Sequence, residues 1–368
     1  SQGKSTNPNT MKDKEIEKEK EKLMKLIGLP LSTILLGDSL DRVAMEVTNP
    51  AGSTLIPRVM VTNIMVYAVT TDIWMDNSRR LHTSNFQHGV RANEVMRDME
   101  LHMVASHGSL TQAKEVVHRD RTLLWCEDSK GNLPLHLAME NGHKEVASYL
   151  VKEYPQASYA LNNLKISPLY LAVEHHPKDL NLVEFMFCKL HGDHNVVDKL
   201  RSGKSIVRAA IKDQNQDMLK TILKHQRDLI KCIDEEGWTP LSYAAYNGFV
   251  DIVEYIIKKF PKSINKYKNK DKSEPIHKAC LGGHVEVLKI FHSNSPKSVL
   301  SRDDEGQTVL HLAAKERDNK LKHVVSYLLT LSEGRGLINK KDENGLIPLK
   351  LAQSIGNHQV EQVIRSMQ

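Results

Sequence analysis

Two short segments carry side chains whose types could do chemistry. Cys188, His191 and His194 follow one another at intervals of three residues and are zinc-ligand types. A closed zinc site needs a fourth ligand, and no second pair lies nearby, so a loop with a buried Cys188 is the favoured interpretation. The segment Ser202 to Ser205 contains Gly-Lys-Ser, but a phosphate-binding loop needs glycine where Asp198 stands. This segment is interpreted as a structural turn.

Three histidines, His136, His277 and His311, would look catalytic if each were taken alone. The sequence contains no H-E-x-x-H, G-x-S-x-G or dinucleotide-binding fingerprint to accompany them. We therefore expect no enzyme activity, no cofactor, no metal and no small-molecule substrate.

The segments that hold these histidines are copies of one another. Clear copies begin at Gly131, Gly237, Ser273 and Gly306, and weaker ones at Met99, Ile166, Lys204 and Leu346. One aligned position is occupied in turn by His102, His136, Tyr170, Arg208, Ser242, His277, His311 and Lys350. The basic spacing is 34 residues, with longer intervals of 38 residues before Arg208 and 39 before Lys350. A period of this length is typical of a stacked repeat protein.

Each copy predicts two short helices joined by a tight turn. In the copy from Gly131, Pro134 suits a first helical position, and Leu135, Ala138 and Met139 share one helical face. Gly142 ends this helix, and a second helix follows. Helices this short are marginal alone, so neighbouring units must stabilise them. Close approach is favoured by one recurring small residue: Ala138, Ala172, Ala210, Ala244, Ala279, Ala313 and Ala352.

The pattern T-P-L-H-x-A-A, then G-H, then an aliphatic run resembles the ankyrin repeat. The resemblance implies an all-α ankyrin-repeat solenoid of about eight units over residues 96–368, with the first and last degenerate. It also implies that the motif histidines bond to backbone between units. An extended concave surface is then the expected functional site, and its ligand another protein.

In the ankyrin family, contacts are made by hairpin tips and inner helices. The matching positions are Ser129, Lys130, Asn132, Glu140, Asn141, Glu235, Glu236, Trp238, Tyr246, Asn247, Asp304, Glu305, Gln307 and Lys315. Trp238 and Tyr246 are the favoured hot spot, because exposed aromatic residues often dominate binding energy. The alternative is that Trp238 only packs on the next hairpin.

A basic segment lies between the copies from Gly237 and Ser273. Its members are Lys258, Lys259, Lys262, Lys266, Lys268, Lys270, Lys272 and, beyond Ser273, Lys278. A solvated basic loop is the first interpretation, and attraction to anionic lipid or an acidic partner is the second. Nucleic acid is the least favoured ligand, because stacking aromatic residues are sparse.

Finer features are similar to plant ankyrin-repeat membrane proteins of the accelerated-cell-death type. They are Tyr154-Pro155, Phe260-Pro261 and Ser295-Pro296 at the ends of second helices. This resemblance implies a regulator in plant defence and cell-death signalling, bound to a membrane-bound ankyrin relative or channel at the cytosolic face of the plasma membrane. The family's C-terminal membrane domain is not in this sequence, so an ankyrin-only relative or a piece of a longer protein is expected. A free cytosolic or nuclear adaptor is the alternative.

Composition agrees with a cytoplasmic protein. The 368 residues carry a net charge of +6, and the Cys content is four, without C-x-x-C or an N-glycosylation acceptor. Such cysteine usage favours a reducing compartment. The apolar segments 29–40 and 59–71 are shorter than the ~20 residues of a membrane span.

Residues 1–95 lack the repeat and are expected to form a partly disordered extension. Residues 11–26 alternate Lys and Glu and predict a charged helix, either solvated or binding a partner. Residues 51–74 are rich in β-branched side chains and leave strand and helix both open.

Overall fold

The computed structural model describes residues 97–316 and 320–367. The predicted charged helix at 11–26, the undecided segment 51–74 and the expected boundary at residues 95/96 all lie outside the described residues. Contacts divide the chain into two units between Met103 and Val104, and the second unit holds the stacked helices.

Eight helix pairs follow the predicted copies. The first helices are α4 (Glu100–His107), α6 (Pro134–Glu140), α8 (Pro168–His175), α11 (Ile206–Lys212), α13 (Pro240–Asn247), α15 (Pro275–Gly282), α17 (Val309–Lys315) and α20 (Pro348–Ile355). The second helices are α5 (Leu110–Arg119), α7 (Lys144–Glu153), α9 (Leu180–Lys189), α12 (Gln216–His225), α14 (Val250–Lys259), α16 (Val285–Asn294), α18 (Lys320–Thr330) and α21 (His358–Arg365). The predicted all-α ankyrin-type solenoid is confirmed.

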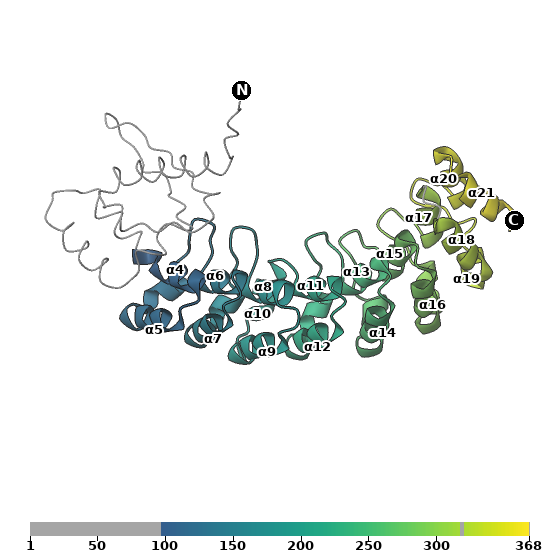
Figure 1. Cartoon of the computed structure of the whole chain (residues 1–368). Helices are drawn as coiled ribbons and strands as arrows, with labels where there is room; N and C mark the ends of the chain where they lie inside the picture. Colours follow the sequence, from purple (N-terminus) through teal and green to yellow (C-terminus); the bar gives the residue numbers. More distant parts are fainter. Residues whose placement is uncertain (1–96, 317–319, 368) are drawn as a thin grey trace, which may run out of the picture. The chain divides into compact units, whose positions relative to one another are not determined.

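The helices form two layers, with hairpin loops along one side (Figure 1). From α6 to α20, each first helix contacts the first helix of the next pair, and second helices contact second helices. Each predicted alanine from Ala138 to Ala352 is fully buried between them. The small side chain is needed because the layers approach closely at this position.

Short 3-10 turns connect one pair to the next. They are η3 (Arg121–Trp125), η4 (Pro155–Tyr159), η5 (Arg227–Lys231), η6 (Pro261–Ile264) and η7 (Pro296–Leu300). Pro155, Pro261 and Pro296 open three of these turns. Proline fits there because a first helical position needs no backbone N–H.

Both long intervals in the repeat contain an additional helix. The 38-residue interval contains α10 (Val196–Arg201), which buries Val196 and Leu200. The 39-residue interval contains α19 (Ser332–Arg335). The interpretation of Cys188 as a buried thiol in a loop is wrong, because Cys188 lies in the last turn of α9 and is exposed.

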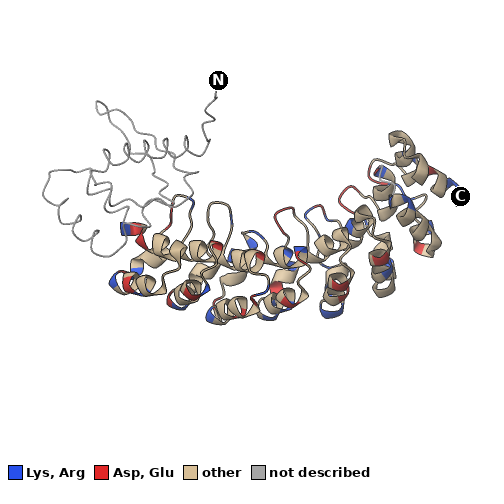
Figure 2. Cartoon of the chain, in the orientation of Figure 1, with Lys and Arg blue, Asp and Glu red and all other residues tan. Residues whose placement is uncertain are grey.

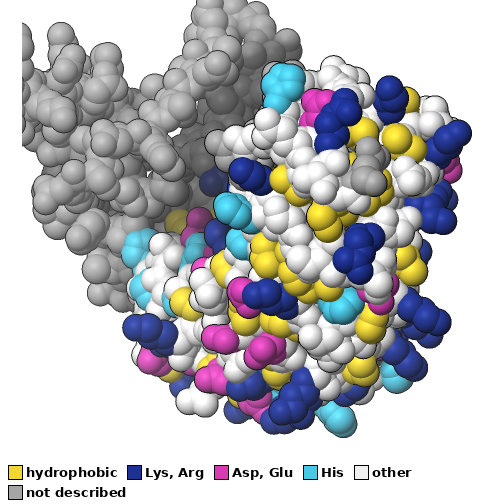
Figure 3. Space-filling model, turned by 90° about the vertical axis from the view of Figure 1, so that its right-hand side faces the viewer, with side chains coloured by type: hydrophobic (Ala, Val, Ile, Leu, Met, Phe, Trp, Pro, Cys, Tyr) yellow, Lys and Arg dark blue, Asp and Glu magenta, His cyan; other side chains and the backbone are white. Residues whose placement is uncertain are grey.

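The last described pair contains an amphipathic helix, α21. Val360 and Ile364 of α21 are buried. Figure 3 looks onto this end of the unit, where hydrophobic side chains lie among Lys and Arg side chains. Leu346 and Met367 are 39% and 42% exposed.

Candidate interaction surface

In four hairpins an aspartate holds the turn, and in the hairpin before α8 Asn162 does the same. Asp234 Oδ1 accepts hydrogen bonds from the backbone N–H groups of Glu236, at 3.0 Å, and Trp238, at 2.8 Å. Asp128, Asp303 and Asp342 make the same pair of bonds in their own hairpins. These bonds leave the following one or two side chains at the hairpin tip, where they face solvent. The recurring Asp-x-x-Gly is the sequence signal for this arrangement.

The motif histidines tie each pair to the next hairpin. The backbone N–H of Leu133 donates to His136 Nδ1 at 3.0 Å, so Nε2 carries the proton and donates to the Ile166 carbonyl at 3.1 Å. His277 and His311 reach the carbonyls of Ser301 and Leu346 in the same way. Burial lowers the pKa of both. The predicted backbone-bonding role is confirmed for these side chains.

A second set of histidines reaches back to the preceding pair. His143 Nε2 lies 2.9 Å from the Ser106 carbonyl oxygen, and His176 Nε2 lies 2.9 Å from that of Met139. In the sequence, His143 stood out only as part of a G-H motif, and His176 was not singled out. Histidines therefore link the units in both directions.

Arg208 occupies the repeat position that histidine occupies in other copies, and it joins its unit to the next hairpin by ion pairs. Its guanidinium lies 3.0 Å from Asp234 and 2.6 Å from Glu236 in the next hairpin. It also lies over the Tyr243 ring, 4.5 Å from the centroid. Sequence reasoning did not identify Arg208 as part of the surface, although its occurrence at the histidine position was a signal.

Trp238 lies between Tyr246 and Lys278. Its ring and that of Tyr246 pack edge to face with centroids 5.0 Å apart, and Lys278 Nζ lies 4.9 Å from the Trp238 ring. Tyr246 is 40% exposed, while Trp238 is half-buried. Trp238 thus contacts the next unit through Lys278. Its side chain is only half-buried, so part of it remains exposed beside Tyr246.

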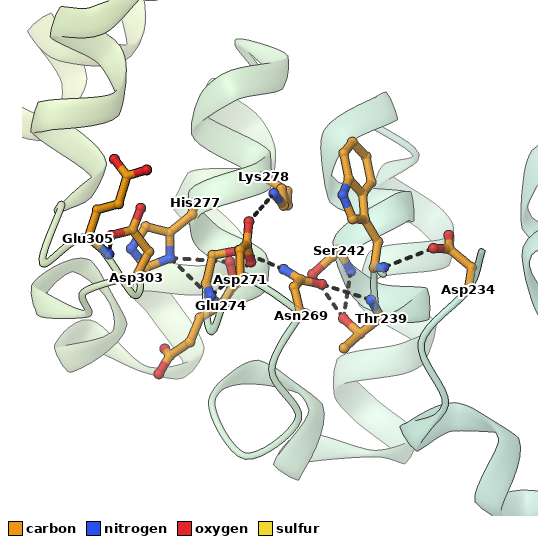
Figure 4. Close-up of polar contacts among 12 residues, drawn as sticks. Asp234, Thr239, Ser242, Asn269, Asp271, Glu274, His277, Lys278, Asp303 and Glu305 are labelled. Atoms are coloured by element: carbon orange, nitrogen blue, oxygen red, sulfur yellow. Dashed lines mark hydrogen bonds and ion pairs between the residues drawn. The ribbon is translucent and has the colours of Figure 1, made fainter. Parts of the chain in front are cut away.

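Polar contacts run from this hairpin into the two that follow (Figure 4). Asn269 accepts from the Thr239 backbone N–H at 2.8 Å, and Lys278 bonds to Asp271 at 2.8 Å. Lys278 is buried, so it does not belong to the exposed basic segment with which the sequence grouped it. Its ammonium group contacts Asp271 and the Trp238 ring within the stack of units.

Twelve of the predicted contact residues are exposed or half-buried: Ser129, Lys130, Glu140, Asn141, Glu235, Glu236, Trp238, Tyr246, Asn247, Asp304, Glu305 and Lys315. Asn132 and Gln307 are different, because they are only 6% and 3% exposed. Asn132 accepts a hydrogen bond from Asn162 of the next hairpin, and Gln307 donates to Glu305. Both side chains form hydrogen bonds that hold the hairpins, so Asn132 and Gln307 are not part of the contact surface.

The basic segment is spread over several elements. Lys258 and Lys259 end α14, Lys262 lies in η6, and Lys266, Lys268, Lys270 and Lys272 surround the following hairpin. All these side chains are exposed. Figure 2 shows basic residues in the hairpin before α15 and acidic ones in the hairpins before α13 and α17. These three neighbouring hairpins therefore alternate in charge.

Cys188, His191 and His194 have the spacing of zinc ligands in the sequence, but no metal-binding group among the described residues contains all three. His191 and His194 are exposed beyond the end of α9. Among the described residues, Cys188 instead lies with Glu184 and His225 in a group that could hold a metal ion.

Comparison with known proteins settles the family. The model for ankyrin repeats matches residues 101–198, 169–268 and 262–335. The chain belongs to the ankyrin-repeat family. Ankyrin repeats are a non-catalytic interaction fold, and this assigns the chain to protein–protein interaction modules.

Several curated proteins share this region. Protein ACCELERATED CELL DEATH 6 of Arabidopsis thaliana is 32% identical over 162 residues, covering 42% of this chain and 24% of that protein. The human transient receptor potential cation channel subfamily A member 1 is 24% identical over 58% of this chain and 19% of its own length. The yeast target of rapamycin complex 2 subunit AVO2 is 27% identical over 41% of this chain and 34% of its own. The chain thus spans between 19% and 34% of the length of each of these relatives.

The described helices give no membrane span. In residues 97–316 and 320–367, none is both long enough and apolar enough to cross a bilayer.

Proposed function

We propose that the chain is a non-catalytic module that binds another protein through its hairpin tips and first helices. The observation that carries this proposal is the aromatic pair of Trp238 and Tyr246 beside Glu235 and Glu236. The pair combines exposed aromatic area with fixed geometry, since Trp238 is held by Lys278 and by the Asp234 turn. Binding hot spots are typically such anchored aromatic side chains surrounded by polar residues.

The proposed partner is a membrane-bound ankyrin relative, and the proposed context is plant defence and cell-death signalling. Support comes from the similarity to ACCELERATED CELL DEATH 6 and from the proline-opened turns after α7, α14 and α16. Recruitment by this partner would bring the chain to the cytosolic face of the plasma membrane. The exposed lysines of the basic segment would add a weak attraction to anionic lipid. The alternative is an adaptor in the cytosol or nucleus with no membrane connection.

The test is binding of the full chain to purified ACCELERATED CELL DEATH 6 in neutral phosphatidylcholine vesicles. The double variant Trp238→Ala/Tyr246→Ala should bind at least about tenfold more weakly, because a hot-spot residue contributes about 2 kcal/mol or more. Neutral vesicles remove the contribution of the lysines. A parallel titration with phosphatidylserine vesicles lacking the protein measures that contribution separately.

The chain offers a matched control pair. Trp125 is 51% exposed and packs edge to face with Tyr154 at 5.8 Å, but both lie outside the hairpins and first helices. Trp125→Ala/Tyr154→Ala should leave binding unchanged. Equal losses in both double variants would contradict the proposed surface. Failure of the wild-type chain to bind the vesicles would remove the membrane-bound relative as partner and favour the adaptor.

A further inference from the structure

Three metal-ligand side chains converge between two second helices, away from the hairpins. Glu184 and Cys188 are four residues apart on α9 and share one face of that helix, and His225 is the last residue of α12. One ligand atom from each lies within 4.8 Å of the other two. Neither their sequence spacing nor the Cys-x-x-His pattern indicates this group, because α9 and α12 belong to different repeats.

His225 is oriented toward this group. Its Nε2 atom is buried and makes no hydrogen bond to any described residue, although Glu184 Oε1 lies only 3.2 Å away. The Phe187 ring stacks on the imidazole with centroids 5.3 Å apart and planes 7° from parallel. A ring nitrogen that is buried, lacks a hydrogen bond and has a fixed direction suits metal coordination.

Glu184 provides an ionised oxygen ligand. Lys224 Nζ lies 2.7 Å from Glu184 Oε1. A metal ion would compete with the Lys224 ammonium for this carboxylate or use the second oxygen. Lys224 is exposed, so its ammonium can move into solvent.

We propose that Glu184, Cys188 and His225 bind a zinc ion that links α9 to α12. One sulfur, one nitrogen and one oxygen ligand suit zinc better than magnesium or calcium, which prefer oxygen. Tetrahedral zinc places such ligand atoms roughly 3.4–3.7 Å apart. Because the three atoms already lie within 4.8 Å of one another, side-chain rotations that move them by about 1 Å or less reach this geometry. Binding replaces the Cys188 S–H proton with the metal and involves no oxidation. The fourth position is open to water or to a ligand from a partner.

The experiment is a titration of the reduced full chain with Co²⁺, which substitutes for zinc and is visible by absorption. The expected result is a near-ultraviolet thiolate-to-cobalt band that zinc abolishes. Cys188→Ser should remove the band. His225→Phe, which keeps the stacking on Phe187, should weaken metal binding at least about tenfold. Zinc should also raise the melting temperature of the wild type and not of Cys188→Ser, because ligands that bind only the folded state stabilise it.

Cys126→Ser is the matched control, since Cys126 is another thiol that is not buried and lies outside the group. It should retain the full cobalt band. The absence of a band in the wild type would overturn the proposal. A band that persists in Cys188→Ser, or that is lost in Cys126→Ser, would place the metal elsewhere and would also overturn it. These results do not depend on partner binding, which the vesicle experiment tests separately.

Discussion

Single side chains in this solenoid serve mainly to join units, and the histidines show this most clearly. His277 is fully buried. Its Nε2 donates to the carbonyl oxygen of Ser301, and its Nδ1 accepts from the backbone N–H of Glu274. Both ring nitrogens are occupied only in the neutral form, because protonation of Nδ1 would convert its acceptor into a donor. Independently of these bonds, desolvation by burial lowers the pKa of His277 and His311.

We therefore expect acid to destabilise the fold. In the unfolded chain these histidines take up protons near pH 6.5, whereas in the folded chain they do so only at lower pH. Stability should be fully present above pH 6.5 and fall as the pH drops below it. Urea denaturation midpoints at pH 7.5, 6.5 and 5.5 would measure this, and His277→Gln should show a shallower pH dependence. A pH dependence that is unaltered in His277→Gln would contradict the assignment.

At the scale of the helix, the close approach of first helices determines which side chains fit. A Cβ atom on Gly282 would meet the carbonyl oxygen of Tyr246, so the backbones of α13 and α15 leave no room for a side chain there. Other units carry Asn at the aligned position, as at Asn141 and Asn247. The fully buried Ala313 in α17 lies in the layer that contacts α15 and α20.

Ala313→Leu should destabilise the chain by about 1–3 kcal/mol, because three additional carbons must enter a packed interface. Thermal denaturation measures the effect. The control is Ser326→Leu, which places the same side chain on the exposed side of α18 and should change the melting temperature little. An unchanged melting curve for Ala313→Leu would contradict the register of the repeat.

At the scale of the whole solenoid, stability comes from contacts between neighbouring units. The candidate contact residues are distributed over several units, from Ser129 to Lys315, and the basic hairpin before α15 lies between the acidic hairpins before α13 and α17. A partner that contacts several units along the solenoid would gain a separate contribution to the binding free energy from each unit.

Such a partner should show additive losses for distant substitutions. Lys130→Ala and Tyr246→Ala lie in different units, with two further repeats between them. Their effects on the binding free energy should sum in the double variant to within about 0.5 kcal/mol. Isothermal titration calorimetry with the same partner measures this. A double variant no weaker than Tyr246→Ala alone would show that the partner contacts only one region.

Much of this protein was determined by the sequence itself. The 34-residue period predicted the helix pairs, and the recurring alanines and motif histidines predicted which positions are buried and which link units. These features can be predicted from the sequence because each depends on local spacing within one repeat. The resemblance to ankyrin repeats added the hairpin tips as candidate contacts, which stay a proposal.

Other features were decided only by how one unit packs on the next. Packing buries Lys278 beside Trp238, uses Asn132 and Gln307 inside the hairpins, and folds the long insertion into α10. Most clearly, it places Cys188 beside Glu184 and His225 rather than beside its sequence neighbours. The physical reason is that a side chain's neighbours across a repeat interface depend on the rotation and spacing of whole helices, and the period of the sequence does not specify these.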